Sequence, residues 1–369
     1  MFLAFRELKH SWLRFLMVGA IMTLLAWLVF LLSGLATGLA TDNASSFQNM
    51  KADYIAFEPE TRQSLSRSLL EKAAAERIRQ VPGVTATAPL GESIITIQTP
   101  AGAKIDVAVF GIEAESFLAP KIDKGSGLKG QPAGSAVVDK TFLESGQLET
   151  GSTLTDPTSG VKLTVTGFTS GQTYSHVPVI FTDMATWQSL RFVNAASKNN
   201  LADPVSAIAI QMNKDQLAPV KALGGLDVVS RQEAIQKLPG YSEEMGTISM
   251  IMVFLFLIAS FIMAAFFYVM TLQKTNQFGI LKTLGASTAF LAKDLVGQVI
   301  LLAAAGVVVG ALLTFGVAAI MPASVPFSLD SAIVLGYGVL LVAVALVGTL
   351  LSLWRIARID PLLAIGRAD

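Results

Sequence analysis

The 369-residue sequence contains no cysteine and only two histidines, His10 and His176. Disulfides, zinc–thiolate sites and iron–sulfur clusters are therefore excluded, and we expect no metal site built from several histidines of one chain. Charged residues are also scarce: they make up 15% of the chain, whereas ordinary soluble domains carry roughly 25%. The formal net charge is +0, so the sequence lacks the basic field that a nucleic-acid-binding protein requires.

A further absence is the phosphate-binding loop Gly-x-x-x-x-Gly-Lys-Ser/Thr, which this sequence does not contain. The backbone amides of that loop cradle nucleotide phosphates, so we do not expect this chain to hydrolyse ATP itself. Residues 42–245 also show no spacing of a nucleophile and a base that predicts catalysis. The sequence therefore favours a protein that is not an enzyme in its own right.

Long uncharged runs are what the sequence has instead, and its mean hydropathy is +0.58. A helix that spans a membrane needs about 20 apolar residues. The run 295–329 is too long for one helix, and Pro322 and Pro326 mark its exit from the bilayer. A cleaved signal peptide is the alternative for the first run, but its apolar region is typically about 7–15 residues long, so we favour an uncleaved anchor. The predicted spans are residues 15–41, 247–272, 295–320 and 331–354.

Basic residues in the short connections predict the orientation of these spans. Nine of them fall on one side if both termini are cytoplasmic and residues 42–245 lie outside, while the connection 321–330 has none. The start, residues 1–14, has the pattern of an interfacial amphipathic helix. We therefore expect a multi-pass protein of a bacterial cytoplasmic membrane. The nine residues are Arg6, Lys9, Arg14, Lys274, Lys282, Lys293, Arg355, Arg358 and Arg367.

Residues 42–245 are predicted to form an extracytoplasmic α+β domain between the first and second spans. Charge interleaved with leucine predicts a helix over 61–81, and a turn at 100–102 predicts a hairpin of strands 93–99 and 104–111. Further strands are expected at 136–138, 161–168, 177–182 and 205–212, with short helices near 139–146, 183–190 and 230–238. The predicted fold is thus a membrane protein with four transmembrane helices, a cytoplasmic segment 273–294 between the second and third, and a cytoplasmic tail 355–369.

The cytoplasmic segment carries the most specific pattern of the chain, Gly-Ile-Leu-Lys-Thr-Leu-Gly-Ala-Ser at 279–287. It resembles the coupling segment of ABC-exporter permeases of the MacB/FtsX type, which typically read Gly-Ile-Leu-Lys-Ala-Leu-Gly-Ala-Ser. The ending Arg358–Ile365 and the layout of one span, a large outside domain and three spans resemble the same family. Gln277 departs from the family pattern, because an acidic residue usually stands there.

This resemblance implies a transport subunit that works with a separate ATPase chain. ATP and Mg would be bound by that ATPase, and two copies of each chain would form a 2+2 complex with a homodimeric permease in the lipid bilayer. Closure of the ATPase would move the spans as rigid bodies through the coupling segment. The resemblance assigns coupling to Lys274, Gln277, Phe278, Gly279, Ile280, Leu281, Lys282, Leu284, Gly285 and Ala286.

Within the family, the sequence is similar to haem-efflux permeases of the HrtB kind, through its length, Phe5–Leu8 and the glycine-rich run 34–39. This resemblance implies haem as the cargo, with no permanently bound cofactor and no metal beyond the haem iron. Haem binding requires flat apolar walls and an axial Met, His or Tyr. Packing and interfacial anchoring are the alternatives for Met and Tyr at such positions. Export of lipoproteins, peptides or drugs, or mechanotransmission to an envelope protein, remain alternative functions. The candidate contacts are Phe47, Gln48, Met50, Tyr54, Tyr241, Glu243, Met245 and Met250, with Tyr174 and His176 as weaker candidates.

Overall fold

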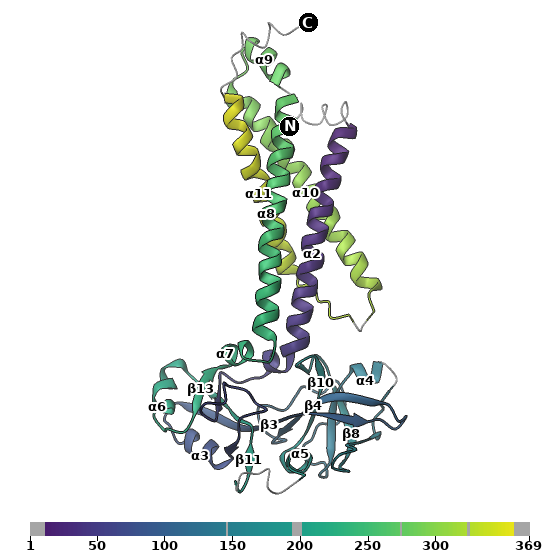
Figure 1. The fold of residues 1–369 in the computed structure, drawn as a ribbon, viewed down its shortest axis with the longest axis vertical. Helices are drawn as coiled ribbons and strands as arrows, with labels where there is room; N and C mark the ends of the chain where they lie inside the picture. The colour runs from purple at the N-terminus through teal and green to yellow at the C-terminus, as the bar shows by residue number, and fades with distance from the viewer. Residues whose placement is uncertain (1–11, 145–146, 194–200, 274, 323–324, 358–369) are drawn as a thin grey trace. The chain divides into compact units, whose positions relative to one another are not determined.

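The computed structural model describes residues 12–144, 147–193, 201–273, 275–322 and 325–357. The chain divides into two compact units (Figure 1). We call residues Leu39–Met245 the sheet unit, and residues Met1–Gly38 together with Gly246–Asp369 the helical unit. Each is described by itself.

The sheet unit is built on one mixed sheet in the order β13-β1-β12-β3-β4-β10-β6-β8-β5, with β7 and β9 attached at its sides. Strand β10 lies parallel to β4 and antiparallel to β6, and β6 lies parallel to β8. A separate pair is formed by β2 and β11. The strands are β1 Tyr54–Phe57, β2 Leu70–Glu71, β3 Val84–Gln98, β4 Lys104–Ile112, β5 Lys124–Gly125, β6 Ser135–Asp139, β7 Thr153–Thr155, β8 Lys162–Thr169, β9 Thr173–Tyr174, β10 Val177–Asp183, β11 Pro204–Val205, β12 Ala207–Met212 and β13 Asp227–Ser230.

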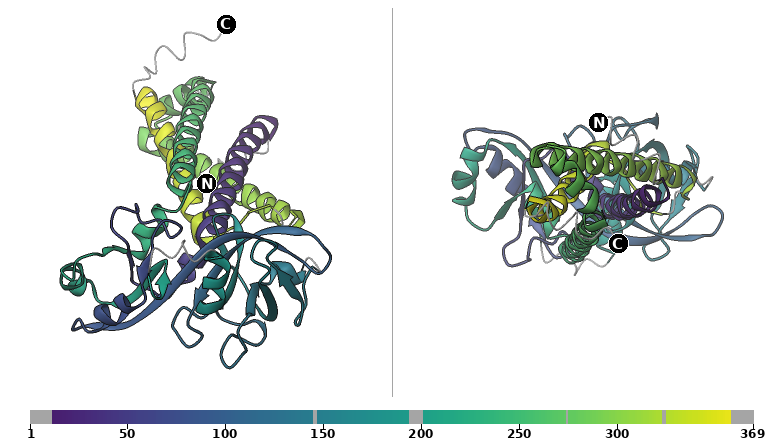
Figure 2. Two further views of the ribbon diagram at one scale, coloured as in Figure 1. Left: turned by 60° about the horizontal axis from the view of Figure 1, so that its bottom comes forward. Right: turned by 90° about the horizontal axis from the view of Figure 1, so that it is seen from above.

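The long strands β3 and β4 sweep across this unit as an antiparallel pair (Figure 2). Their alternating side chains supply two apolar cores, one on each face of the sheet. The first core is covered by α3 (Ala73–Arg79) and α5 (Met184–Arg191). The second is covered by the end of α2 (Trp12–Asn49) and by α7 (Arg231–Gln236). Shorter elements are α4 Thr141–Glu144, the 3-10 turn Lys214–Gln216 and α6 Leu217–Lys221.

A pair of glycines seats the largest side chain of the first core. Gly91 of β3 lies directly across from Gly111 of β4, and the Trp187 ring packs over both. A Cβ added at Gly91 would lie 2.2 Å from this ring, and one at Gly111 would lie 2.5 Å from Trp187 Cβ. The Trp187 indole N–H donates to Ser93 Oγ at 3.1 Å, so its polar atom is satisfied inside the core.

The helical unit contains four helices that are long and apolar enough to cross a membrane. They are α2, α8 (Tyr241–Gln273), α10 (Thr288–Ile320) and α11 (Ser331–Ala357), and the short α9 (Thr275–Thr283) follows α8. Together with the α+β sheet unit, which lies in the chain between the first and second of these helices, they confirm the predicted fold class.

Small residues allow close packing of helices within the helical unit. A Cβ at Gly306 of α10 would lie 2.7 Å from Met22 Cβ, and one at Gly310 would lie 2.9 Å from Ala26 Cβ. On α2, a Cβ at Gly34 would meet the Phe327 ring at 2.4 Å. The close contacts at Gly34, Gly306 and Gly310 therefore form within one chain.

The structure differs from the predicted elements in the bounds of the apolar helices and in several elements of the sheet unit. All four apolar helices extend beyond the predicted spans. Helices α2 and α8 continue with polar residues at the ends next to the sheet unit in sequence, α10 begins at Thr288 and α11 ends at Ala357. The helix predicted over 61–81 is wrong in its first half: only Ala73–Arg79 is helical, and Arg62 and Gln63 have positive φ. Leu70 instead pairs as a strand with Val205, so a non-local contact overrides the local pattern. The sequence predicted none of the strands β1, β5, β7, β9 and β13.

Candidate functional site

The coupling segment forms a helix that ends abruptly. At the end of α9 the Ala286 N–H donates to Leu281 O at 2.9 Å and the Gly285 N–H donates to Lys282 O at 3.0 Å. This pair of bonds is a Schellman motif, which requires a left-handed residue, and Gly285 has φ +92°. Two residues later, Ser287 Oγ accepts from the Phe290 N–H and caps α10. Four residues, 284–287, therefore separate the end of α9 from the start of α10.

The two sides of α9 differ in what they contact. Leu281 and Ala286 pack against the apolar cluster around Leu291 and Leu295 of the helical unit. Ile280 and Leu284, one turn apart, expose 55% and 78% of their surface. The structure thus combines apolar contacts of Leu281 and Ala286 with an exposed apolar pair, Ile280 and Leu284.

The structure places most of the predicted coupling residues on this element. Gly279 is buried and Lys282 is half-buried. Gln277 and Phe278 fall within α9, while Lys274 lies outside the described residues, as do His10 and the ending 358–369.

Four of the predicted haem contacts come together in the second core of the sheet unit. Phe47 is fully buried and stacks on Tyr174 with ring centroids 5.8 Å apart. Tyr174 meets Phe110 edge-on at 5.4 Å. Met50 and Tyr241 pack against this cluster as partly buried side chains. Burial raises the pKa of Tyr174 well above its ordinary value, so its hydroxyl stays protonated.

The remaining predicted contacts do not join this cluster. Tyr54 lies in β1 and belongs to the first core, on the opposite face of the sheet. The Gln48 amide donates to Ala40 O at 3.4 Å. Glu243 is exposed and Met245 is half-buried in α8. Met250 belongs to the helical unit and exposes 56% of its surface.

His176 lies in a polar cluster that draws on three parts of the sheet unit. It occupies the tight turn between β9 and β10, where Ser175 and His176 both have positive φ. The His176 Nδ1 atom lies 2.9 Å from Asp42 Oδ2. Its Nε2 atom lies 3.1 Å from Asn43 Nδ2 and 3.5 Å from Glu244 Oε2. Both ring nitrogens are engaged, so ligation of haem iron would require the imidazole to give up one of these contacts.

Glu92 is a buried acid that the sequence reading did not single out. It lies in β3, two residues after Leu90, so both side chains point to the face of the second core. Glu92 has no exposed surface. Neither carboxyl oxygen has a hydrogen-bond partner among the described residues. Burial raises the pKa of Glu92 from its ordinary 4.5 to about 7, against the opposing field of Arg191. A glutamate within an apolar alternation is the only signal the sequence gives for it.

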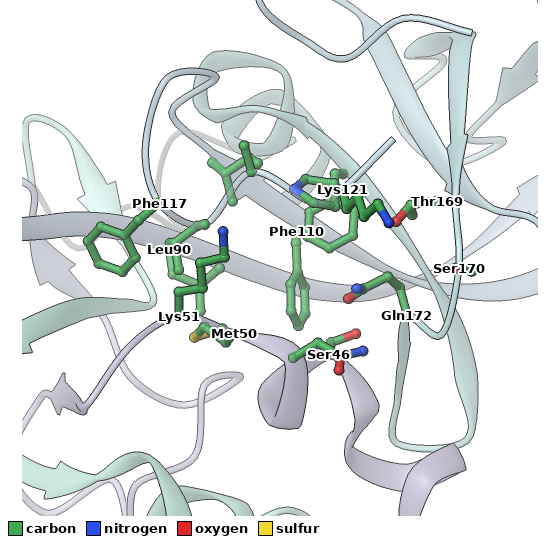
Figure 3. A pocket seen from close by; sticks show the side chains of 16 residues that line it. Ser46, Met50, Lys51, Leu90, Phe110, Phe117, Lys121, Thr169, Ser170 and Gln172 are labelled. Carbon is green, nitrogen blue, oxygen red and sulfur yellow. The ribbon is translucent and has the colours of Figure 1, made fainter. Parts of the chain in front are cut away.

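Met50 also lines a cavity of about 630 Å³ in the sheet unit, which sequence reasoning missed (Figure 3). Its wall comes from the end of α2, from β3, β4 and β10, and from the loops at 117–121 and 169–172. These segments are far apart in the sequence, and only the sheet topology brings them together. Phe110 and Phe181 of the aromatic cluster form part of the wall.

Comparisons with known proteins identify relatives of this chain. A family model described as FtsX-like permease C-terminal matches residues 249–361. A protein of Staphylococcus haemolyticus named as the HrtB permease of a hemin transport system is 30% identical over 364 residues, covering 99% of each chain. A protein of that name from Staphylococcus epidermidis is 26% identical over 367 residues, again covering 99% of each. The solved periplasmic region of MacB from Actinobacillus actinomycetemcomitans aligns with a TM-score of 0.38 and 11% identity, over 51% of this chain and 92% of that one.

Proposed function

Because the chain belongs to the FtsX-like family of ABC transporter permeases, we propose that it is the membrane subunit of an ATP-driven exporter and that its cargo is haem. The observation that carries the first part is α9, a short helix with an exposed apolar pair placed in the chain between two membrane-length helices. ATP would be hydrolysed, with Mg, by a separate ATPase chain, since this sequence lacks a phosphate-binding loop.

Coupling rests on the mechanical continuity of this element. Leu281 and Ala286 tie α9 to the helical unit, while Ile280 and Leu284 stay available to a partner. A displacement of α9 by the ATPase would therefore move the start of α10 with it, since Ser287 fixes that start. The distribution of basic residues supports cytoplasmic termini, a cytoplasmic α9 and an extracytoplasmic sheet unit. Two copies of the chain with two ATPase chains would complete the complex.

Haem as cargo rests on two supports. The two staphylococcal relatives compared above are named for hemin transport. The sheet unit also gathers Phe47, Tyr174, Tyr241 and Met50, side chains of the types that surround haem or ligate its iron. Mechanotransmission to an envelope protein, or export of a lipoprotein, peptide or drug, is the competing function.

Coupling is tested with variants of the α9 terminus in cells and in purified permease–ATPase complex. Gly285→Pro places a fixed negative φ where φ is +92°, and Lys282→Glu reverses the charge on α9. Both variants should hydrolyse ATP yet lose protection against hemin. Gly316→Ala is the control, because a Cβ there meets nothing within 4 Å. Normal hemin resistance in both α9 variants would rule out the coupling role.

The cargo is tested with hemin added to the purified complex. We expect hemin to stimulate ATP hydrolysis and to give a Soret band that is shifted from that of free hemin. If neither occurs and a protein co-purifies stably with the sheet unit, mechanotransmission is the better function.

A further inference from the structure

The end of α2 is held by a side chain from the segment that leads into α8. The Arg231 guanidinium donates from Nη1 to the carbonyl oxygens of Phe47, Gln48 and Met50, at 3.2 Å for Phe47 and 3.0 Å for Met50. The last carbonyls of a helix have no partner within that helix, and a cation beside them interacts favourably with the helix dipole. Arg231 therefore supplies both the donors and the charge that the C-terminal end of α2 needs.

The backbone of Arg231 is fixed as well. Its N–H donates to Asp53 O at 3.0 Å. Arg231 is the first residue of α7, and the start of this helix is capped by Ser230 Oγ, which accepts from the Glu233 N–H at 3.2 Å. Because both the backbone and the side chain of Arg231 are held, the guanidinium joins the end of α2 to α7 with little freedom.

The connection from α7 to α8 is short and closed by backbone hydrogen bonds. It contains four residues, 237–240. The Lys237 N–H donates to Ala234 O, the Leu238 N–H to Ile235 O and the Tyr241 N–H to Leu238 O, each at 3.1 Å. The path from the end of α2 through Arg231 and α7 to the start of α8 therefore contains no long loop.

A second contact joins the same two helices directly. The Asn43 amide of α2 donates to Glu244 Oε2 of α8 at 3.4 Å, beside the His176 ring. Both residues belong to the sheet unit. Within this unit the end of α2 and the start of α8 are thus linked at two places, through Asn43 and through Arg231.

We propose that Arg231 is a positioning residue for coupling, which clamps the end of α2 to the start of α8 so that the two helices act on the sheet unit as one body. Helix α9 directly follows α8 in the chain, so a displacement of α9 by the ATPase reaches α8, and the clamp passes it to α2. The coupling role rests on the proposed function, whereas the clamp rests on the contacts of the sheet unit alone.

The clamp is tested by the distance between two spin labels in the full-length chain in nanodiscs, without ATPase. The chain has no cysteine, so Gln48→Cys at the end of α2 and Ser242→Cys at the start of α8, both exposed positions, take one label each. An excess of unlabelled chain removes distances between copies. The doubly labelled chain should give one narrow distribution of distances. Arg231→Met, which keeps a long side chain but removes its donors, should broaden it.

Two further variants separate the clamp from general stability. Arg191→Met is the matched control, because Arg191 also makes three side-chain hydrogen bonds in the sheet unit, to Glu92 O, Ser66 O and Ser206 Oγ, and none of these partners belongs to α2 or α8. Its distribution should stay narrow. Arg231→Lys keeps a cation with three donors and should stay close to the parent. Equal widths in the parent and Arg231→Met would overturn the clamp, as would equal broadening in Arg191→Met.

Coupling is tested in the permease–ATPase complex by the amount of hemin exported per ATP hydrolysed. Arg231→Met should lower this ratio about fivefold, which is the lower end of typical coupling between two sites, while Arg191→Met and Arg231→Lys should keep it near that of the parent. An unchanged ratio in Arg231→Met would overturn the coupling role. A parent complex that exports no hemin would overturn the proposed haem export together with the coupling role that rests on it, and would leave the clamp in place.

Discussion

The two units of this protein differ in how many of their large apolar side chains are exposed. In the sheet unit the large hydrophobic residues that are exposed, among those described, are Ile94, Val193 and Leu223. The helical unit exposes many more, with Phe261 at 76% and Leu335 at 70% as examples. Water drives the first arrangement, and lipid permits the second, because lipid tails are as apolar as leucine.

The difference shows which interactions hold each unit together. The sheet unit buries two apolar cores on the faces of one sheet. Its free energy of unfolding should therefore depend on the apolar area that it buries, as in soluble proteins. The helical unit gains little from hiding apolar surface, so its stability should depend on close packing of its helices, as at Gly306 and Gly310. Three substitutions would break or sharpen this contrast.

The largest effect is expected for Trp187→Ala in the first core of the sheet unit. Removal of a fully buried indole from the glycine pair Gly91 and Gly111 leaves a cavity and should cost about 4 kcal/mol. Hydrogen exchange of the full-length chain would show faster exchange in β3 and β4 and unchanged exchange in α10. Equal acceleration in both units would show that the two do not unfold separately.

A somewhat smaller effect is expected from the ionisation of Glu92. Its pKa is about 7 in the folded protein and about 4.5 when unfolded, so the folded state holds the proton more tightly. Stability should therefore be greatest below pH 4.5, should fall as pH rises towards 7, and should level off above it. The total loss is about 3 kcal/mol.

The control for this pH dependence is Glu92→Gln, which cannot ionise. Unfolding of the variant, followed by urea titration at several pH values, should lose the slope between pH 4.5 and 7 that the parent shows. If the parent itself shows no such slope, the pKa of Glu92 is the same in the folded and the unfolded protein.

The smallest effect is expected for Gly306→Leu in the helical unit. A Cβ there would lie 2.7 Å from Met22 Cβ, so the helices must separate, at about 2 kcal/mol. Gly316→Leu, in the same helix with open space around its Cβ, should cost little in a membrane. Thermal inactivation in nanodiscs would rank the two, and an equal loss would argue against close packing as the source of stability.

Much of the architecture could be read from the sequence because its signals are local. Long uncharged runs predicted the four apolar helices, and Gly285-Ala286-Ser287 predicted the turn that the structure realises as a Schellman motif followed by a cap. The hairpin of β3 and β4 was likewise signalled by the turn between its strands.

What escaped depends on contacts between distant segments. Leu70 became a strand because Val205 lies beside it, and β1 is sheltered between β12 and β13. The wall of the cavity includes residues of β4 and β10, two strands that pair in parallel, and no short sequence pattern encodes that pairing. Contacts between distant segments also bring together His176, Asp42 and Glu244.

The link Gly285–Ala286–Ser287 also sets the angular phase between α9 and α10. Gly285 supplies the left-handed turn, Ala286 an apolar contact and Ser287 the cap. An α-helix turns about 100° per residue. Deleting one residue of the link would therefore remove the turn, the apolar contact or the cap. Inserting one residue would rotate the side chains of α10 by about 100° relative to α9. At this point of the chain, length is therefore constrained more tightly than side-chain chemistry.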